Sequence, residues 1–129
     1  MLEAGEFLLS KGAAYAVVKQ GEYGATLLGR DSAGNLQIFR CPAYPLKTLV
    51  DPTGAGDTFL GALAGYLATL PPVLPSFEEV KRGIVYGTVA ASFTCESFSA
   101  DALLSMTEET FRRRLEEYAE MCRLPGVSC

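Results

Sequence analysis

The run Asp51-Pro52-Thr53-Gly54-Ala55-Gly56-Asp57 is the most informative stretch of this chain, because it stands directly before an apolar helix. The apolar residues from Phe59 to Leu70 recur at helical spacing. Backbone N–H groups at a helix N-terminus form an anion site, which the positive end of the helix dipole strengthens. Glycine lets a ligand approach the backbone closely, because it has no Cβ atom. The run therefore predicts an anion site at the start of this helix.

Asp57 is unusual in such a site, because its carboxylate would repel a bound phosphate. The residue makes chemical sense if it faces a hydroxyl group that loses its proton while attacking a phosphoryl group held by the amides. This arrangement predicts a small-molecule kinase. The alternative is a tight turn in which Asp57 is only a favourable carboxylate at a helix start.

Two common phosphate-binding motifs do not fit the glycines of this run. A P-loop reads G-x-x-x-x-G-K-[ST], and no lysine follows Gly56. A dinucleotide fingerprint reads G-x-G-x-x-G, and here Phe59 stands where its last glycine would be.

The composition excludes several classes of protein. At 129 residues the chain is the size of one domain, and 49% hydrophobic residues are enough for a core. The net charge of −4 argues against a nucleic-acid surface, which would need a basic patch. The run Arg112-Arg113-Arg114 stands close to Glu116, Glu117 and Glu120, so we expect a solvated helix face with i,i+4 pairs.

The sequence contains four cysteines and no histidine. No pair of cysteines has C-x-x-C spacing, so a zinc site is not expected. Without histidine there is also no Ser-His or Cys-His nucleophile. Scattered thiols without a signal peptide are typical of the cytoplasm. The uncharged stretch from Thr58 to Leu74 is interrupted by Pro71 and Pro72, which leaves it too short to span a bilayer.

The hydrophobic pattern predicts an α/β layer structure, with one strand buried on both faces as in a parallel sheet. A capping box at Ser76 and Glu79 starts a helix that runs to about Cys95. Gly61 and Gly65, four residues apart, are expected to allow close helix packing. The other expected elements are a helix over 2–11, strands over 14–18 (the doubly buried one), 25–28 and 36–39, a hairpin turn over 31–35, a short turn over 100–106 capped by Ser99, a helix starting at Thr107, and a loose tail over 124–129.

The whole run D-P-T-G-A-G-D-T-F resembles the C-terminal signature of the ribokinase-like (PfkB) family of sugar and nucleoside kinases. The upstream stretch Val17-Val18-Lys19-Gln20-Gly21-Glu22-Tyr23-Gly24 is similar to the strand and turn that precede the nucleotide site of that family. The order and spacing of the two elements also match, and the resemblance extends from near Met1 to about Leu104. It implies the C-terminal portion of a three-layer αβα fold.

The resemblance implies a catalytic role for residues of the run. Asp57 would be the base that takes the proton from a substrate hydroxyl. Gly54, Ala55 and Gly56 would form an anion hole for the charge that develops on the transferred phosphoryl group. Positioning and electrostatic stabilisation are most of what phosphoryl transfer requires of a protein.

The resemblance also implies where cofactors bind. ATP would lie along Lys19, Gly21 and Gly24 and reach Gly56, and Mg²⁺ would have its main ligands in an N-terminal part that carries an N-x-x-E motif. Asp51 and the Thr53 carbonyl match a site for a monovalent cation such as K⁺. For Asp51 a turn-forming side chain that binds its own backbone is an equal alternative.

Two departures from the family pattern affect these expectations. The stretch from Phe93 to Ser99 matches poorly the small-residue loop that completes the cation site in relatives. An asparagine that often touches the adenine is missing, and Tyr86, Gly87 and Thr88 are the candidates near that place.

Members of the family are much longer than this chain, and their N-terminal half binds the sugar or nucleoside. We therefore expect residues 1–129 to be a single partial domain, inactive alone, whose exposed parallel sheet edge favours homo-oligomers. Three functions compete: part of an ATP-dependent sugar or nucleoside kinase, a non-catalytic nucleotide-binding module, and a structural fragment.

Overall fold

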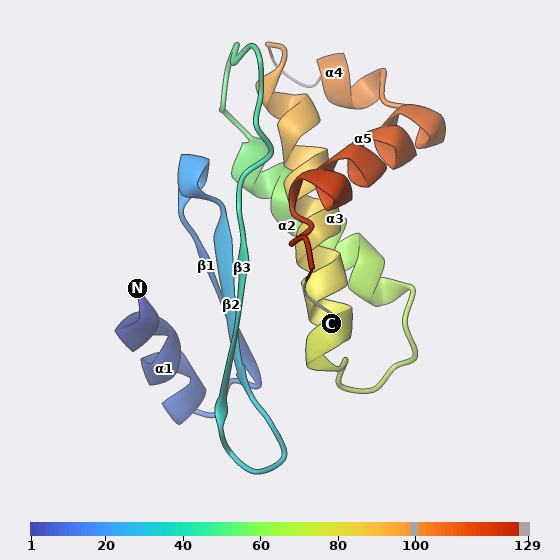
Figure 1. Cartoon of the computed structure of the whole chain (residues 1–129). Coiled ribbons are helices and arrows are strands. Elements are labelled where there is room, and N and C mark those ends of the chain that lie inside the picture. The colour runs from blue at the N-terminus through green and yellow to red at the C-terminus, as the bar shows by residue number, and fades with distance from the viewer. Residues whose placement is uncertain (99–100, 127–129) are drawn as a thin grey trace.

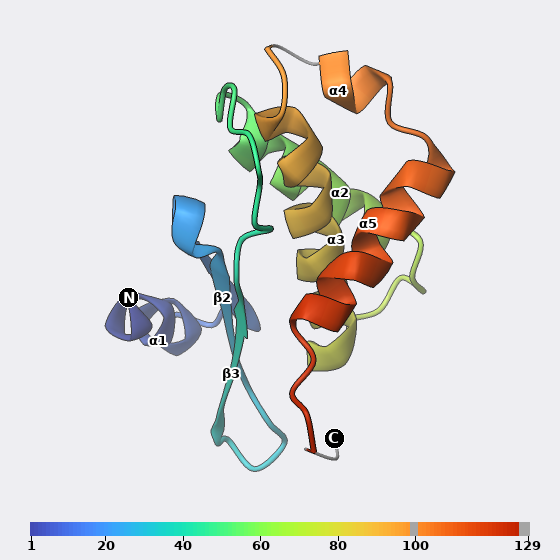
Figure 2. The same cartoon turned by 45° about the horizontal axis from the view of Figure 1, so that its top comes forward.

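The computed structural model describes residues 1–98 and 101–126, which form three layers (Figures 1 and 2). Helix α1 lies on one face of a three-stranded sheet, and α2, α3 and α5 lie on the other. The elements in chain order are α1 (Leu2–Ser10), β1 (Tyr15–Lys19), the 3₁₀ helix η1 (Gly21–Tyr23), β2 (Ala25–Arg30), β3 (Leu36–Cys41), α2 (Ala55–Ala68), α3 (Phe77–Cys95), α4 (Asp101–Leu104) and α5 (Glu108–Met121).

The sheet has the order β1-β2-β3 and is antiparallel throughout. The hairpin turn between β2 and β3 is as predicted, because Asp31 Oδ1 accepts hydrogen bonds from the N–H groups of Ala33 at 2.9 Å and Asn35 at 2.8 Å. The expectation of a parallel sheet edge is wrong: short connections join neighbouring strands here, and such connections give antiparallel pairs.

The strand that is buried on both faces is β2, whereas the sequence favoured β1 for this role. Ala25 to Gly29 are all buried, because β2 lies between the other two strands. On β1 only Ala16 is buried and Lys19 is exposed, since β1 pairs with β2 alone in the described sheet.

Neighbouring leucines of β2 connect the two sides of the sheet. Leu27 packs in a cluster with Phe59 of α2 and Ile84 of α3, while Leu28 packs with Leu9 of α1. Both leucines are fully buried. The alternation of side chains along a strand places them on opposite faces, so β2 is the shared centre of both clusters.

Helices α2 and α3 pack closely at two glycines of α3. A Cβ atom at Gly83 would lie 2.6 Å from Leu63 Cδ1, and one at Gly87 would lie 2.9 Å from the Phe59 carbonyl oxygen. The prediction that Gly61 and Gly65 allow this packing is wrong, because no atom of a described neighbouring residue lies within 4 Å of a Cβ built at either position. The glycines that allow the close approach are therefore those of α3, not those of α2.

The predicted helix starts at Ser76 and Thr107 are confirmed. Ser76 Oγ accepts from the Glu79 N–H at 3.2 Å, and Glu79 Oε2 accepts from the Ser76 N–H at 2.7 Å. Thr107 forms the equivalent pair of bonds with Thr110. The predicted cap Ser99 and the tail residues 127–129 lie outside the described residues. In the described ranges, no helix combines the length and the apolar character that crossing a membrane requires.

The arginine run on α5 is only partly a solvated helix face. Arg112 and Arg113 are exposed, as predicted, but the side chain of Arg114 is only 17% exposed. Its partner is Glu96 at the end of α3, at 2.8 Å, so the expected i,i+4 pairing is wrong for this residue. A tertiary contact between two helices has replaced the local pair.

Candidate active site

A cavity of about 540 Å³ lies where four segments of the chain meet. The first segment is the turn after β1, the second is the irregular crossing from Ala43 to Pro52, the third is the first turn of α2, and the fourth is one side of α3. Most of the lining residues are apolar or small. Lys19 is the one basic residue among the described residues of the lining, and Glu22 is the one acid.

Lys19 lies at the end of β1 and reaches the run that precedes α2. Its Nζ donates a hydrogen bond to the Gly56 carbonyl oxygen at 3.4 Å. A Cβ atom at Gly56 would lie 2.9 Å from the same nitrogen, so a larger residue would displace the lysine. The structure thus brings together two predicted nucleotide-binding residues.

Gly21 and Gly24 frame the turn that follows Lys19, and both line the cavity. Both have positive φ, +56° and +91°, which favours glycine. A Cβ atom at Gly24 would lie 2.0 Å from the Cys41 carbonyl oxygen. Gly24 is therefore required for the turn to pass under the end of β3 and form this wall of the cavity.

The predicted anion hole lies at the N-terminus of α2. Gly54 caps the helix with φ +83°, and the Ala55 N–H already donates to the Pro52 carbonyl at 3.1 Å. No side chain caps this helix, and neither the Gly56 nor the Asp57 N–H has a partner among the described residues. Since Ala55 and Gly56 line the cavity, an anion there would meet these amides and the positive helix end.

Asp57 lies in the first turn of α2, and its side chain is exposed. It is not part of the cavity lining, although Gly56 immediately before it is. The predicted base therefore stands beside the predicted phosphate site. No described residue forms a hydrogen bond with its carboxylate.

The Asp51 side chain forms a turn by bonding to its own backbone, which was the alternative to its role as a cation ligand. Its Oδ1 accepts a hydrogen bond from the Thr53 N–H at 2.9 Å. This backbone bond, followed by one from the Thr53 hydroxyl, lowers the pKa of the Asp51 carboxyl group. The Cys95 carbonyl accepts from the N–H groups of Val50 at 2.9 Å and Asp51 at 3.3 Å. In the described part of the chain, no three His, Cys, Asp or Glu side chains are grouped to hold a metal ion.

Of the three candidates for an adenine contact, only Thr88 lines the cavity. Gly87 packs against Phe59, and the ring of Tyr86 lies 5.0 Å from that of Tyr66 and 5.8 Å from that of Phe111. The wall of α3 also includes Ala91, Ser92 and Cys95, which the sequence analysis missed. Their positions relative to Thr88 follow the helical repeat, and this was the signal that could have found them.

Comparison with known proteins identifies the chain at the level of the family. The model of the pfkB family of carbohydrate kinases matches residues 1–106. Ribokinase of Mus musculus is 37% identical over 93 residues, which are 71% of this chain and 27% of the mouse protein.

Solved structures of low sequence identity share the fold. A nucleoside kinase of Methanocaldococcus jannaschii, an archaeal member of the ribokinase family, has a TM-score of 0.60 at 21% identity, over 81% of this chain and 30% of its own. The ligand-free nucleoside kinase of Burkholderia thailandensis has a TM-score of 0.64 at 19% identity, over 85% and 32%. Ribokinase from Giardia lamblia has a TM-score of 0.65 at 15% identity, over 81% and 32%.

The chain spans about a third or less of each of these relatives. The described residues share the ribokinase fold over that span. The chain belongs to the pfkB family of carbohydrate kinases.

Proposed function

We propose that this chain is the nucleotide-binding and catalytic-base part of an ATP-dependent kinase, which moves the γ-phosphate to an alcohol group of a sugar or nucleoside. The observation that carries the proposal is a cavity lined by Lys19 and by the start of α2, where the Gly56 N–H has no partner among the described residues. The apolar residues of the lining suit a base, and the amides at the start of α2 with the charge of Lys19 suit phosphates.

ATP fits the residues that are present. Gly21 and Gly24 allow a ligand to lie against the backbone, and Gly56 lines the same cavity. Lys19 offsets part of the phosphate charge. ATP supplies the phosphoryl unit when bound, and the proposed anion hole of Gly54, Ala55 and Gly56 stabilises the charge that develops on it. The N–H groups of Gly54 and Gly56 have no partner among the described residues, whereas that of Ala55 already donates to the Pro52 carbonyl. The free amides are therefore the donors, each contributing about 10²–10³ in rate.

Asp57 is the proposed general base. Its place beside the anion hole allows it to accept the proton of an attacking hydroxyl, a role that contributes about 10²–10⁴ in rate. The attack requires the acceptor to be held in contact with the phosphoryl group. Because the chain spans 27% of mouse ribokinase, we propose that further polypeptide of a longer kinase holds the acceptor.

The metal ions are a separate part of the proposal. The main Mg²⁺ ligands do not fit the described residues, which offer no group of three suitable side chains, so no step is assigned to the metal here. A monovalent cation at Asp51 and the Thr53 carbonyl would compete with the turn that the Asp51 side chain already forms. The three described cysteines, Cys41, Cys95 and Cys122, are free thiols, which favours a reducing compartment, the cytoplasm.

A chimera tests the catalytic proposal. The segment of mouse ribokinase that matches this chain is replaced by the chain itself, and phosphate transfer to ribose is measured. We expect transfer, and we expect Asp57→Asn to lower kcat by at least about 10²-fold while ATP still binds. A chimera that folds and binds ATP but transfers no phosphate would instead support a non-catalytic nucleotide-binding module.

Calorimetry on the chain alone tests the remaining alternative, which is a structural fragment that binds no nucleotide. We expect the chain to bind ATP and to show no transfer to ribose, fructose or adenosine without its acceptor-binding part. A chain that binds no ATP would be a structural fragment.

A further inference from the structure

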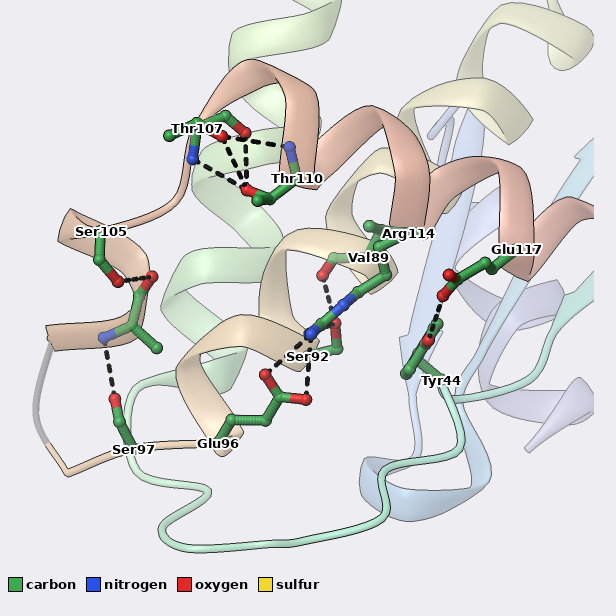
Figure 3. A network of polar contacts seen from close by, with 11 residues as sticks. Tyr44, Val89, Ser92, Glu96, Ser97, Ser105, Thr107, Thr110, Arg114 and Glu117 are labelled. Atoms are coloured by element: carbon green, nitrogen blue, oxygen red, sulfur yellow. Dashed lines mark hydrogen bonds and ion pairs between the residues drawn. The ribbon is translucent and has the colours of Figure 1, made fainter.

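Helix α5 lies beyond the residues that the family model matches, which end at 106. It nevertheless contacts the segments that form the wall of the nucleotide cavity (Figures 2 and 3). The contacts come from Arg114, Glu117 and Tyr118, which lie on one side of the helix. A second hollow, which shares Tyr44 with the nucleotide cavity, lies between α5 and the end of α3.

Arg114 is the centre of this contact. Its Nη2 donates to both carboxylate oxygens of Glu96, at 3.0 and 2.8 Å, and its Nη1 donates to Ser92 Oγ at 2.9 Å (Figure 3). The guanidinium carbon lies 3.7 Å from the ring centre of Phe93 and 5.1 Å from that of Tyr44. One side chain thus joins α3 to the crossing that follows β3.

The same crossing is held by two more residues of α5. The Tyr44 hydroxyl donates to Glu117 Oε2 at 3.2 Å, and the Tyr118 hydroxyl donates to the Pro42 carbonyl. Tyr118 is 3% exposed, so it fixes this end of α5 firmly against the chain. The segment from Pro42 to Tyr44 is therefore held by α5.

The residues that Arg114 touches belong to the cavity or adjoin it. Ser92 and Tyr44 line it, from α3 and from the crossing respectively. Glu96 follows Cys95, which lines the cavity and whose carbonyl accepts the Val50 and Asp51 amides at the start of the signature run. A change in the position of Arg114 would therefore displace residues in two walls of the cavity and in the segment that leads to the anion hole.

We propose that Arg114 is a positioning residue for nucleotide binding, which sets the distance between the Tyr44 wall and the Ser92 wall. The inference rests on the proposed function, because it assumes that the cavity takes ATP. Arginine suits this role because its planar fork forms two bonds to a carboxylate and stacks on aromatic rings at the same time. Lysine keeps the charge but cannot do both.

The experiment compares two probes, ATP and inorganic tripolyphosphate, by calorimetry on the full chain. Tripolyphosphate meets the amides and Lys19 but has no group to contact the two walls. We expect Arg114→Met to weaken ATP binding about tenfold, because the walls are no longer preorganised, and to leave tripolyphosphate binding unchanged. Arg112→Met, which removes the same charge from an exposed position of α5, is the matched control and should change neither.

Arg114→Lys is a second, more conservative variant, which can be measured if Arg114→Met does not fold. It retains the positive charge near Glu96, and we expect ATP affinity between those of the wild type and of Arg114→Met. Equal ATP affinity in the wild type and the folded Arg114 variants would overturn the inference. Equal weakening of both probes would also overturn it, since a merely structural role predicts that result. A wild-type chain that binds tripolyphosphate but not ATP would refute the proposed function itself, and this inference with it.

Discussion

The Nζ atom of Lys19 lies 3.4 Å from the carbonyl oxygen of Gly56, although 37 positions separate the two residues in the sequence. The contact joins the end of β1 to the first turn of α2, and both residues line the cavity. It also leaves the lysine charge beside the start of α2, where the Gly56 and Asp57 N–H groups have no partner within the part of the chain that the structure describes.

Lys19→Met should weaken ATP binding, because a charge-assisted contact to phosphate is lost. We expect a loss of about 1.5–3 kcal/mol and a shallower dependence of Kd on salt, as is usual for hydrogen bonds to charged groups. Calorimetry at two salt concentrations measures both. Lys11→Met removes the same charge next to α1, on the other face of the sheet, and should leave Kd unchanged.

Gly24→Ala should disrupt the turn at the cavity. Its Cβ would lie 2.0 Å from a backbone oxygen at a φ of +91°, so we expect a loss of at least about 2–4 kcal/mol from strain and overpacking together. Gly34→Ala is the control, since its φ is +84° but no atom lies within 4 Å of the new Cβ. If denaturant titrations give equal losses for the two variants, the clash is not the cause.

Gly87→Ala and Gly61→Ala should have opposite effects on stability. At Gly87 the methyl group meets the Phe59 backbone, so we expect a loss of about 1–3 kcal/mol. At Gly61 it meets no neighbour, and removing a mid-helix glycine should stabilise the chain by about 0.4–1 kcal/mol. Thermal melts of both variants provide the measurement. A destabilised Gly61→Ala would mean that another molecule or segment packs against this side of α2 in solution.

The free energy of unfolding should fall at alkaline pH because of Tyr118. Burial, with hydrogen bonding by Cys41 next in importance, raises the pKa of its hydroxyl. The native state therefore holds the neutral form, so this contribution is complete below the ordinary tyrosine pKa of about 10 and is lost as the pH rises above it, by at most about 1.4 kcal/mol per pH unit.

Tyr118→Phe tests this prediction in urea titrations from pH 8 to pH 11. At pH 8 the variant should be less stable by about 1–2 kcal/mol, because the Pro42 carbonyl loses its partner. The difference should shrink above pH 10, since phenylalanine does not ionise. A difference that stays constant with pH would assign the alkaline slope to other groups, such as the Cys41 thiol, whose pKa burial also raises.

The isolated chain should self-associate. Strand β1 pairs only with β2 in the described sheet, and Phe7 and Leu8 on α1 are 59% and 47% exposed. An open strand edge beside apolar side chains favours association between copies. Sedimentation across a range of concentrations should show it, and Phe7→Ser with Leu8→Ser should reduce it. A wild-type chain that stays monomeric would contradict the prediction.

The local features of the site could be predicted from the sequence, whereas its long-range contacts could not. Gly21, Gly24 and Gly54 have a positive φ, which is a local property of the backbone turn. Gly56 has no such φ, and its missing Cβ atom matters because of Lys19, 37 residues earlier. The orientation of the strands and the packing of α2 on Gly83 and Gly87 depend on which surfaces meet. The pair between Arg114 and Glu96 depends on how two helices dock, and neither residue's neighbours in sequence reveal it.

The two central leucines of β2 have a consequence for the alignment of the sheet. Shifting a strand by one residue exchanges its faces, and here the exchange would replace Leu27 by Leu28, so the apolar pattern would hardly distinguish the two alignments. The glycines around this pair do distinguish them. Gly24 fits beneath the Cys41 carbonyl, and a Cβ at Gly29 would lie 2.9 Å from the Phe77 ring, so a slipped strand would drive a leucine into that ring. The glycine that shapes the cavity thus also helps to keep β2 aligned with its neighbours.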